Sequence, residues 1–231
     1  MTSPSGGTGI RVCFRNISLT GCGFESHLGH KAFMIKTVLF DIDGVVVLKK
    51  IRFSQRFSND FGIPIEEVLP FFENEFGLCL IGKADLKEEL KKYLARWNWQ
   101  KTADELLEYW LSLENAVSEK IIDSVKKLRA SGIKCFLNTN NEKYRVKYLL
   151  ENIGLKKYFD GIFSSGEIGY TKSQQEFWQT VYSRLGTPDK KTVLVWDDDE
   201  KNIQSAKNFG FLAEPYTDFN NYKNKINNII K

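Results

Sequence analysis

The feature that most constrains this chain is a pair of aspartates placed directly after a short apolar run. Residues 38–40 are typical of a buried parallel strand, and Asp41 and Asp43 follow with Gly44 behind them. Because alternate side chains of an extended segment point the same way, we expect both carboxylates to face one point at the strand's carboxyl end. Ligands bind at that edge of an open α/β sheet. The pair therefore indicates a cation or a shared proton, although an acidic turn without a ligand also fits these residues alone.

The length and composition limit the classes of protein that fit. A chain of 231 residues with 13% aromatic residues holds one large domain, or one domain carrying a smaller insertion. Its formal charge of +4 is spread along the chain, so we expect no nucleic-acid partner. No apolar run approaches the roughly 20 residues of a membrane span, so we expect no membrane partner. The four cysteines form no C-x-x-C pair, which favours idle thiols and a cytoplasmic location.

The first 33 residues differ from the rest of the chain. They are rich in Gly, Ser and Thr, show no sustained periodicity, and precede Met34, which directly precedes the first strand. We interpret residues 1–33 as a non-native or disordered leader that results from a misassigned start codon. Both histidines, His27 and His30, lie within it. If the folded domain lacks this segment, histidine-based catalysis and a histidine-bound zinc are excluded, and acid–base chemistry falls to carboxylates, lysine or tyrosine.

The remaining chain divides into two patterns. Residues 54–115 have helical periodicity, with helix starts indicated at Asp85 and at Thr102 with Glu105. Residues 34–53 and 116–231 alternate strands with helices, and Ser118 is a candidate cap for the first of these helices. We therefore predict an α/β fold with a Rossmann-like parallel sheet and helices on both faces. Residues 34–53 and 116–231 form its core domain, and residues 54–115 form an inserted all-helical domain.

Polar residues follow four of the predicted segments, and the topology brings their ends to one edge of the sheet. The residues concerned are Asp41, Asp43, Thr139, Asn140, Lys172, Asp197 and Asp198. Carboxylates make an oxygen-only site that suits Mg²⁺. A hydroxyl, an amide and a lysine suit a phosphoryl group, and an aspartate can act as the phosphoryl acceptor.

With these residues in this order, the chain resembles the haloacid dehalogenase-like hydrolase superfamily over residues 34–215. The first motif, D-x-D-G, matches residues 40–45, and the second, a strand ending in Thr or Ser before Asn, matches residues 136–140. The third matches residues 169–172, although Ser173 replaces the proline that usually follows the lysine. The fourth, an acidic pair with a downstream Asn, matches residues 193–198 with Asn202. The helical insertion after the first motif resembles the helical-cap, phosphatase-like subgroup.

The resemblance implies a role for each catalytic residue. Asp41 attacks phosphorus to form an aspartyl-phosphate, and Asp43 serves as general acid and then as general base. Thr139, Asn140 and Lys172 bind the phosphoryl group, and Thr139 is preferred over Asn138 because Asn140 follows it. Lys172 also screens Asp41, although a surface lysine at the start of a helix fits the residue alone.

The resemblance also implies a Mg²⁺ site. Asp198 and Asp41 are the expected ligands with the backbone carbonyl of Asp43, and Asp197 supports them from behind. Asp199 is expected to be the cap of the following helix and not a ligand.

Among the chemistries of this family, Asp43 favours phosphoryl transfer over dehalogenation. The absence of histidine between Val46 and Phe57 disfavours a β-phosphoglucomutase. We therefore predict a Mg²⁺-dependent phosphomonoester hydrolase acting on a small phosphorylated metabolite. The alternatives are a phosphomutase and a catalytically silent binding or regulatory member. The candidate substrate contacts are unranked, and the oligomeric state is left open; these contacts are Arg52, Arg56, Lys83, Lys87 and Trp97.

Overall fold

The structure is a computed structural model, and it describes residues 34–48, 51–113, 115–187 and 189–229. The predicted leader therefore lies outside the described residues. In the part of the chain that is described, no helix has the length and apolar character needed to cross a membrane.

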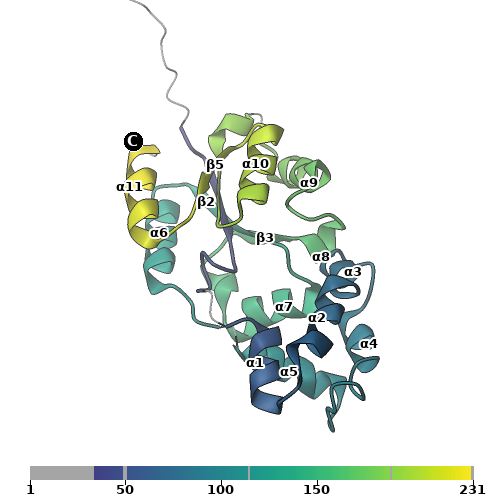
Figure 1. Cartoon of the computed structure of the whole chain (residues 1–231). Coiled ribbons are helices and arrows are strands. Elements are labelled where there is room, and N and C mark those ends of the chain that lie inside the picture. The colour runs from purple at the N-terminus through teal and green to yellow at the C-terminus, as the bar shows by residue number, and fades with distance from the viewer. Residues whose placement is uncertain (1–33, 49–50, 114, 188, 230–231) are drawn as a thin grey trace, which may run out of the picture. The chain divides into compact units, whose positions relative to one another are not determined.

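A five-stranded parallel sheet forms the centre of the fold, in the order β3-β2-β1-β4-β5 (Figure 1). The strands are β1 (Thr37–Asp41), β2 (Lys134–Thr139), β3 (Gly161–Ser164), β4 (Val193–Asp197) and β5 (Leu212–Pro215). All paired strands run parallel, with β1 in the middle between β2 and β4. The predicted fold class is thus confirmed, and the ends of β1, β2 and β4 lie next to one another.

The helices fall into two groups along the chain. The first comprises α1 (Phe53–Phe61), α2 (Ile65–Glu73), α3 (Phe76–Leu80), α4 (Leu86–Lys91) and α5 (Ala103–Leu113). The second comprises α6 (Glu119–Ala130), α7 (Lys143–Lys147), α8 (Ser165–Ile168), α9 (Gln175–Leu185), α10 (Glu200–Phe209) and α11 (Phe219–Ile229). The first group follows β1 without an intervening strand, as the sequence indicated.

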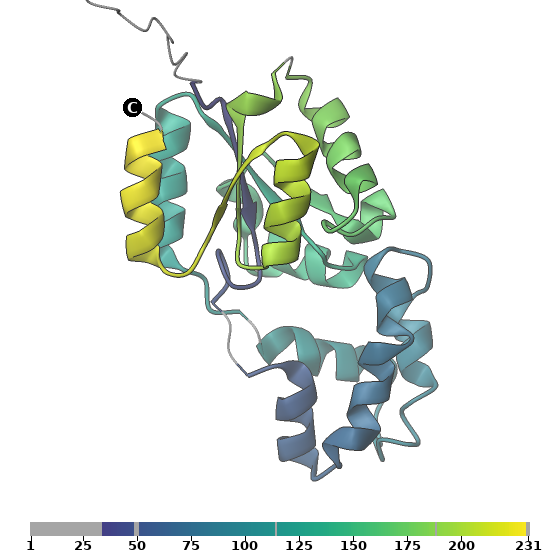
Figure 2. The same ribbon diagram turned by 45° about the horizontal axis from the view of Figure 1, so that its top comes forward.

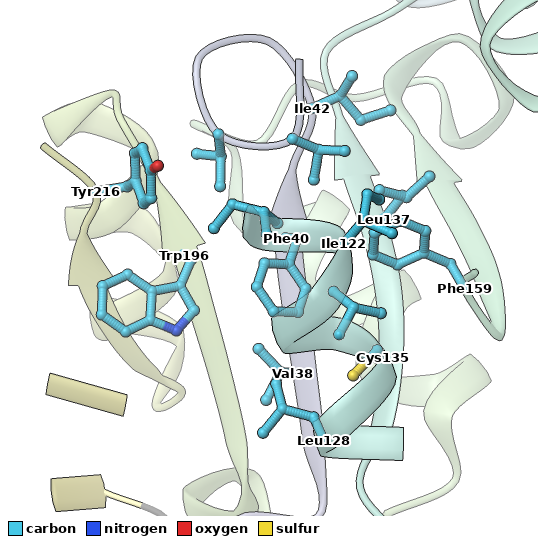
Figure 3. Close-up of a cluster of buried hydrophobic side chains, with 14 of the residues drawn as sticks. Val38, Phe40, Ile42, Ile122, Leu128, Cys135, Leu137, Phe159, Trp196 and Tyr216 are labelled. Carbon is cyan, nitrogen blue, oxygen red and sulfur yellow. The ribbon is translucent and has the colours of Figure 1, made fainter. Parts of the chain in front are cut away.

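Alternation along β1 directs its side chains to both faces of the sheet. Val38 and Phe40 belong to the cluster that includes residues of α6 and α11, whereas Leu39 packs with residues of α9 and α10. Figure 2 shows α6 and α11 on one side of the sheet and α9 and α10 on the other. Figure 3 shows the first cluster, in which Phe40 lies near Ile122 of α6. The prediction of helices on both faces is confirmed.

Helices α1–α5, here called the helical block (residues 53–113), have a hydrophobic cluster of their own. The cluster is strongly aromatic: the rings of Phe53 and Trp110 stack with centroids 4.4 Å apart. Trp97 is 1% exposed and its indole N–H donates to the carbonyl of Glu67 at 3.0 Å. A separate cluster is what an inserted domain requires, and the predicted division between residues 54–115 and the core stays a prediction.

Of the three helix starts expected from the sequence, two are capped by the predicted side chains and one is not. Asp85 caps α4 by accepting from the backbone N–H groups of Lys87 and Glu88, and Thr102 and Glu105 form a reciprocal capping box before α5. Ser118 precedes α6 but its side chain makes no capping hydrogen bond. Helix α4 also ends at Lys91, although the apolar pattern continues to Trp97, because the chain proceeds through turns.

The helical block touches the segments that follow β2 and β3. The Ser165 hydroxyl donates to the carbonyl of Leu80 at 2.5 Å, and the Tyr144 hydroxyl donates to Asp85 at 2.8 Å. Gly82 has φ of 68°, and a Cβ placed on it would collide with the carbonyl oxygen of Gly166. Because a backbone group cannot move aside as a flexible side chain can, this contact requires glycine at position 82.

Gly82→Ala tests this contact, with Gly62→Ala as its matched control. Gly62 has nearly the same φ, 66°, but a Cβ there meets nothing within 4 Å. The control should lose about 1–2 kcal/mol of unfolding free energy for the left-handed backbone alone. We expect Gly82→Ala to lose at least about 1 kcal/mol more, because it adds a collision with backbone. Urea denaturation of both variants measures the difference, and equal losses would contradict the close contact.

Asp85 gives the fold a specific pH dependence. Burial alone would raise the pKa of Asp85, but hydrogen bonds from Lys143, Tyr144 and the backbone N–H of Glu88 lower this pKa to about 2, below the usual value for an aspartate. A lowered folded-state pKa stabilises the fold above the unfolded pKa, and the contribution is lost as the pH falls through the folded pKa.

We therefore expect Asp85→Asn to lose roughly 2 kcal/mol of unfolding free energy near pH 7. The gap to the native chain should close between about pH 4 and pH 2. Urea denaturation of both proteins across this range measures it. A gap that stays constant with pH would show that the carboxylate's charge is not what stabilises the contact.

Candidate active site

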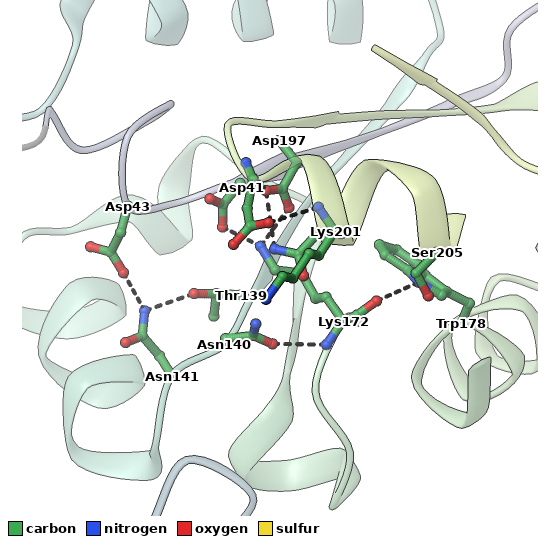
Figure 4. Close-up of polar contacts among 12 residues, drawn as sticks. Asp41, Asp43, Thr139, Asn140, Asn141, Lys172, Trp178, Asp197, Lys201 and Ser205 are labelled. Carbon is green, nitrogen blue, oxygen red and sulfur yellow. Dashed lines mark hydrogen bonds and ion pairs between the residues drawn. The ribbon is translucent and has the colours of Figure 1, made fainter. Parts of the chain in front are cut away.

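A buried lysine links the ends of two neighbouring strands. The Lys172 ammonium donates to Oδ1 of Asp41 at 2.5 Å and to Oδ2 of Asp197 at 2.7 Å (Figure 4). Asp41 ends β1 and Asp197 ends β4, and the side chains of these three residues are between 0% and 8% exposed. The predicted convergence of strand ends therefore brings these three residues into direct contact.

The acidic pair at the end of β4 divides into two different environments. Oδ1 of Asp197 accepts from the Asn202 amide at 3.1 Å and from the backbone N–H of Asp199 at 2.9 Å, so both its oxygens are occupied. Asp198 is partly exposed, and one of its oxygens lies within 4.8 Å of carboxylate oxygens of Asp41 and Asp197. Asp199 caps α10 by accepting from the backbone N–H of Lys201, as expected.

Burial and neighbouring charges shift the pKa values of Asp41 and Lys172. Burial raises the pKa of Asp41 to about 8, with Asp197 adding to the rise and Lys172 opposing it. Burial would lower the pKa of Lys172, but the charges of Asp41 and Asp197 outweigh it and raise the pKa. Asp41, Asp197 and Asp198 each have a carboxylate oxygen within 4.8 Å of those of the other two. Such a cluster of oxygen ligands fits a divalent cation.

Both backbone polar groups of Lys172, its N–H and its carbonyl, are hydrogen-bonded to side chains. Its backbone N–H donates to the side-chain oxygen of Asn140 at 2.9 Å, and its carbonyl accepts from the Trp178 indole at 2.7 Å. It lies in the turn before α9, three residues ahead of the helix it was expected to open. Ser173, in the place of the usual proline, has its hydroxyl 2.9 Å from that of Thr171. Asn140 therefore connects the second motif to the third.

The Asp43 carboxylate belongs to a second group of polar residues. Its Oδ2 accepts from the Asn141 amide at 2.6 Å, and its Oδ1 pairs with the Arg145 guanidinium at 3.1 Å. The same Asn141 amide also donates to the Thr139 hydroxyl at 2.7 Å. Figure 4 shows Asp43 and Asn141 to one side of the group around Lys172. Asp41 and Asp43 thus have different partners, because β1 ends at Asp41 and Asp43 lies in the following turn.

The side chains of Asn138 and Thr139 take opposite directions, as expected for neighbours in a strand. Thr139 joins the polar group through Asn141. Asn138 is fully buried, and neither polar atom of its side chain has a hydrogen-bond partner among the described residues. The geometry therefore favours Thr139 over Asn138 as the hydroxyl or amide at the site.

A pocket of about 370 Å³ extends from Asp43 and Arg145 into the helical block. Asn140, Asn141 and Glu142 also line its polar end, while most other lining residues are aliphatic or aromatic. Of the five substrate contacts suggested by the sequence, Arg52 alone lines this pocket. The others lie elsewhere: Arg56 pairs with Asp60, Lys83 lines a smaller pocket, Lys87 pairs with Asp104, and Trp97 packs in the core of the block.

Two residues of the site were not predicted, Asn141 and Arg145. Asn141 lies directly before the N-cap of α7, and Arg145 lies in the first turn of that helix. Glu142 holds this turn, accepting from the backbone N–H groups of Tyr144 and Arg145 at 2.6 Å each. The position of Asn141 directly after Thr139-Asn140 is the signal in the sequence that points to it.

Comparisons with known proteins identify the family of this chain. A model of the haloacid dehalogenase-like hydrolase family matches residues 35–210. The GMP/IMP nucleotidase YrfG of Escherichia coli is 25% identical over 187 residues, covering 76% of this chain and 80% of the relative. A glyceraldehyde 3-phosphate phosphatase of Methanocaldococcus jannaschii is 30% identical over 92 residues, 40% of each chain.

Solved structures share the fold. A HAD family enzyme from Bacteroides thetaiotaomicron, in complex with magnesium and inorganic phosphate, matches with a TM-score of 0.68 and 22% identity, covering 78% of this chain and 93% of that one. A predicted HAD-like family hydrolase from Porphyromonas gingivalis matches with a TM-score of 0.73 and 18% identity, and the match covers 86% of this chain and 98% of that chain. Since the family model spans most of the sequence with all four motifs inside it, the chain belongs to the haloacid dehalogenase-like hydrolase family.

Proposed function

We propose that the protein is a Mg²⁺-dependent phosphomonoester hydrolase that acts through an aspartyl-phosphate on Asp41. The observation that carries the proposal is the Lys172 ammonium held between Asp41 and Asp197, with Asp198 close to both. A phosphate dianion approaches a carboxylate only where positive charge offsets their repulsion. The nucleotidase and phosphatase relatives support a small phosphorylated metabolite as substrate.

In the first step, a carboxylate oxygen of Asp41 forms a bond to phosphorus while the bond from phosphorus to the leaving oxygen breaks. Lys172 keeps Asp41 in place, and with Thr139 and Asn140 it holds the phosphoryl oxygens. In the second step, water attacks the aspartyl-phosphate, which regenerates the Asp41 carboxylate and releases inorganic phosphate.

Asp43 is the proposed acid and base. It gives a proton to the leaving alkoxide and takes one back from the attacking water. Its carboxyl group borders the pocket, where the leaving group is expected to lie. Asn141 and Arg145 fix both of its oxygens, and Asn141 links its position to that of Thr139.

The metal site is proposed on Asp41, Asp198 and the backbone carbonyl of Asp43, with Asp197 supporting from behind. Asp197 fits the supporting role because Lys172, Asn202 and the N–H of Asp199 already occupy its oxygens. When bound, Mg²⁺ would supply positive charge that neutralises the phosphate and lowers the pKa of the nearby carboxylates.

The helical block is the proposed cap that selects the substrate, and a cytoplasmic location remains our prediction. A phosphomutase is disfavoured because it is expected to carry a histidine in the helical block, and residues 34–231 contain no histidine. A silent binding member is disfavoured because Asp41, Lys172 and the acidic pair are all present.

Asp41→Asn tests the reaction. We expect Mg²⁺-dependent release of phosphate from para-nitrophenyl phosphate to fall at least about 10³-fold, because the amide cannot act as nucleophile. Asp123→Asn, which alters an exposed aspartate paired with Lys126 on α6, is the matched control and should keep full activity. Native protein that releases no phosphate from a broad panel of phosphomonoesters would favour the silent binding member.

Lys172→Gln separates the ammonium from the metal ligands. We expect a loss of at least about 10²-fold in phosphate release, because positive charge beside Asp41 is removed. The affinity for Mg²⁺ should stay the same or increase, since a competing cation is gone. Asp198→Asn, by contrast, should lower both the rate of phosphate release and the affinity for Mg²⁺. Mg²⁺ titration calorimetry with activity assays measures the two effects, and loss of Mg²⁺ binding in Lys172→Gln would contradict the assigned roles.

A further inference from the structure

We propose that the substrate's leaving group is apolar and ring-sized, an alicyclic or aromatic alcohol, and not a polyhydroxylated one. The inference rests on the proposed phosphomonoester hydrolysis and adds the chemical class of the substrate. Its basis is the pocket between the polar site and the helical block.

The pocket changes character along its length. At one end, Asp43, Asn141 and Arg145 offer hydrogen bonds, and their partners are mostly one another. Beyond them the pocket is lined by aliphatic and aromatic residues of the helical block, among them Phe72 and Trp110. Because the pocket reaches the polar site at Asp43 and Asn140, a leaving group that extends past Asp43 would meet this apolar part.

The apolar part belongs to the packed interior of the helical block. Leu107 and Trp110 are 4% and 9% exposed, and both belong to the hydrophobic cluster of that block. Phe72 packs against Trp110 with ring centroids 5.4 Å apart. Aromatic rings fixed by their neighbours keep the pocket's shape, so an occupant meets a surface already formed.

Most hydroxyl groups of a polyhydroxylated ring would lose water in this part of the pocket without gaining a partner. Eight lining residues of the block have aliphatic or phenyl side chains, and beside them Arg52, Ser54 and Trp110 are the described lining residues with a hydrogen-bonding group. Burying an unpaired hydroxyl is costly, and burying a ring carbon is favourable. The chemistry of the lining therefore selects for an apolar ring.

The pocket is large enough for such a group. Its volume of about 370 Å³ accommodates a six-membered ring with a short linker to the phosphate.

Cyclohexylmethyl phosphate and glucose 6-phosphate make a matched pair of substrates. Both are phosphates of a primary alcohol on a six-membered ring, so they differ mainly in the hydroxyl groups of the ring. With Mg²⁺ present, we expect kcat/KM for cyclohexylmethyl phosphate to be at least about 10-fold higher. Acetyl phosphate, which is too small to fill the pocket, reports phosphoryl transfer alone.

Leu69→Asn makes the pocket more polar without changing its size greatly. Leu69 lines the pocket and is 37% exposed, so we expect the variant to fold. Its kcat/KM for cyclohexylmethyl phosphate should fall about threefold or more, while that for acetyl phosphate stays constant. Leu78→Asn is the control, since Leu78 is 49% exposed in the same block and does not line the pocket.

The outcomes separate this inference from the proposed function. If glucose 6-phosphate is hydrolysed as fast as cyclohexylmethyl phosphate or faster, the inference is overturned and the proposed function stands. If para-nitrophenyl phosphate is hydrolysed but neither ring ester is, the inference is likewise overturned and the proposed function stands. If neither these esters nor the broad panel of phosphomonoesters releases phosphate, the proposed function is overturned. Calorimetric titration with cyclohexylmethyl phosphonate and the phosphonate analogue of glucose 6-phosphate then decides the pocket: preferential binding of the apolar phosphonate supports the inference, and equal or absent binding overturns it.

Discussion

The buried contact of Lys172 with Asp41 and Asp197 is the interaction on which the rest of the site depends. A buried ammonium is costly unless carboxylates compensate it, and two buried carboxylates repel each other unless a cation lies between them. Each member of the group therefore requires the others. Because the three residues come from the ends of β1 and β4 and from the turn before α9, the contact also fixes the relative positions of those segments.

The strand order explains how distant parts of the sequence meet there. β1 lies between β2 and β4, and all three run in the same direction. Thr139 and Asp197 are therefore brought to either side of Asp41 by backbone pairing alone. Lys172 needs more support because it stands in a turn, and Asn140 and Trp178 provide it by bonding its N–H and its carbonyl.

The strands and the polar residues at their ends were predictable from the sequence. The positions of residues that lie in turns were not. Apolar runs and the polar residues behind them located β1, β2 and β4 and hence Asp41, Thr139 and Asp197. The side chain of Asp43 was placed less well, because the alternation rule holds only within a strand and β1 ends two residues earlier. Apolar residues at helical spacing continue to Trp97 although α4 ends at Lys91, because such residues also pack from successive turns. Asn98, with φ of 46°, marks where the chain leaves any helical path. Arg145 was missed because an arginine on a short helix is usually a solvated residue, and only its partner Asp43, 102 positions away, makes it part of the site.

The site also separates two physical tasks. The ionic group around Lys172 is built from the sheet, and its geometry is fixed by strand pairing and by charges that must be balanced. The apolar part of the pocket is built from the helical block, whose shape is set by aromatic packing. The two meet at Asp43, whose carboxylate is hydrogen-bonded to Asn141 and Arg145 and which lines the pocket together with them. Because the hydrogen bonds described for the Lys172 ammonium go to Asp41 and Asp197 and not to the block, substitutions in the pocket should change which leaving group is accepted without changing how phosphorus is attacked. Asp43 is the exception: it belongs to both parts, so the nature of the leaving group and the proton it receives remain coupled there.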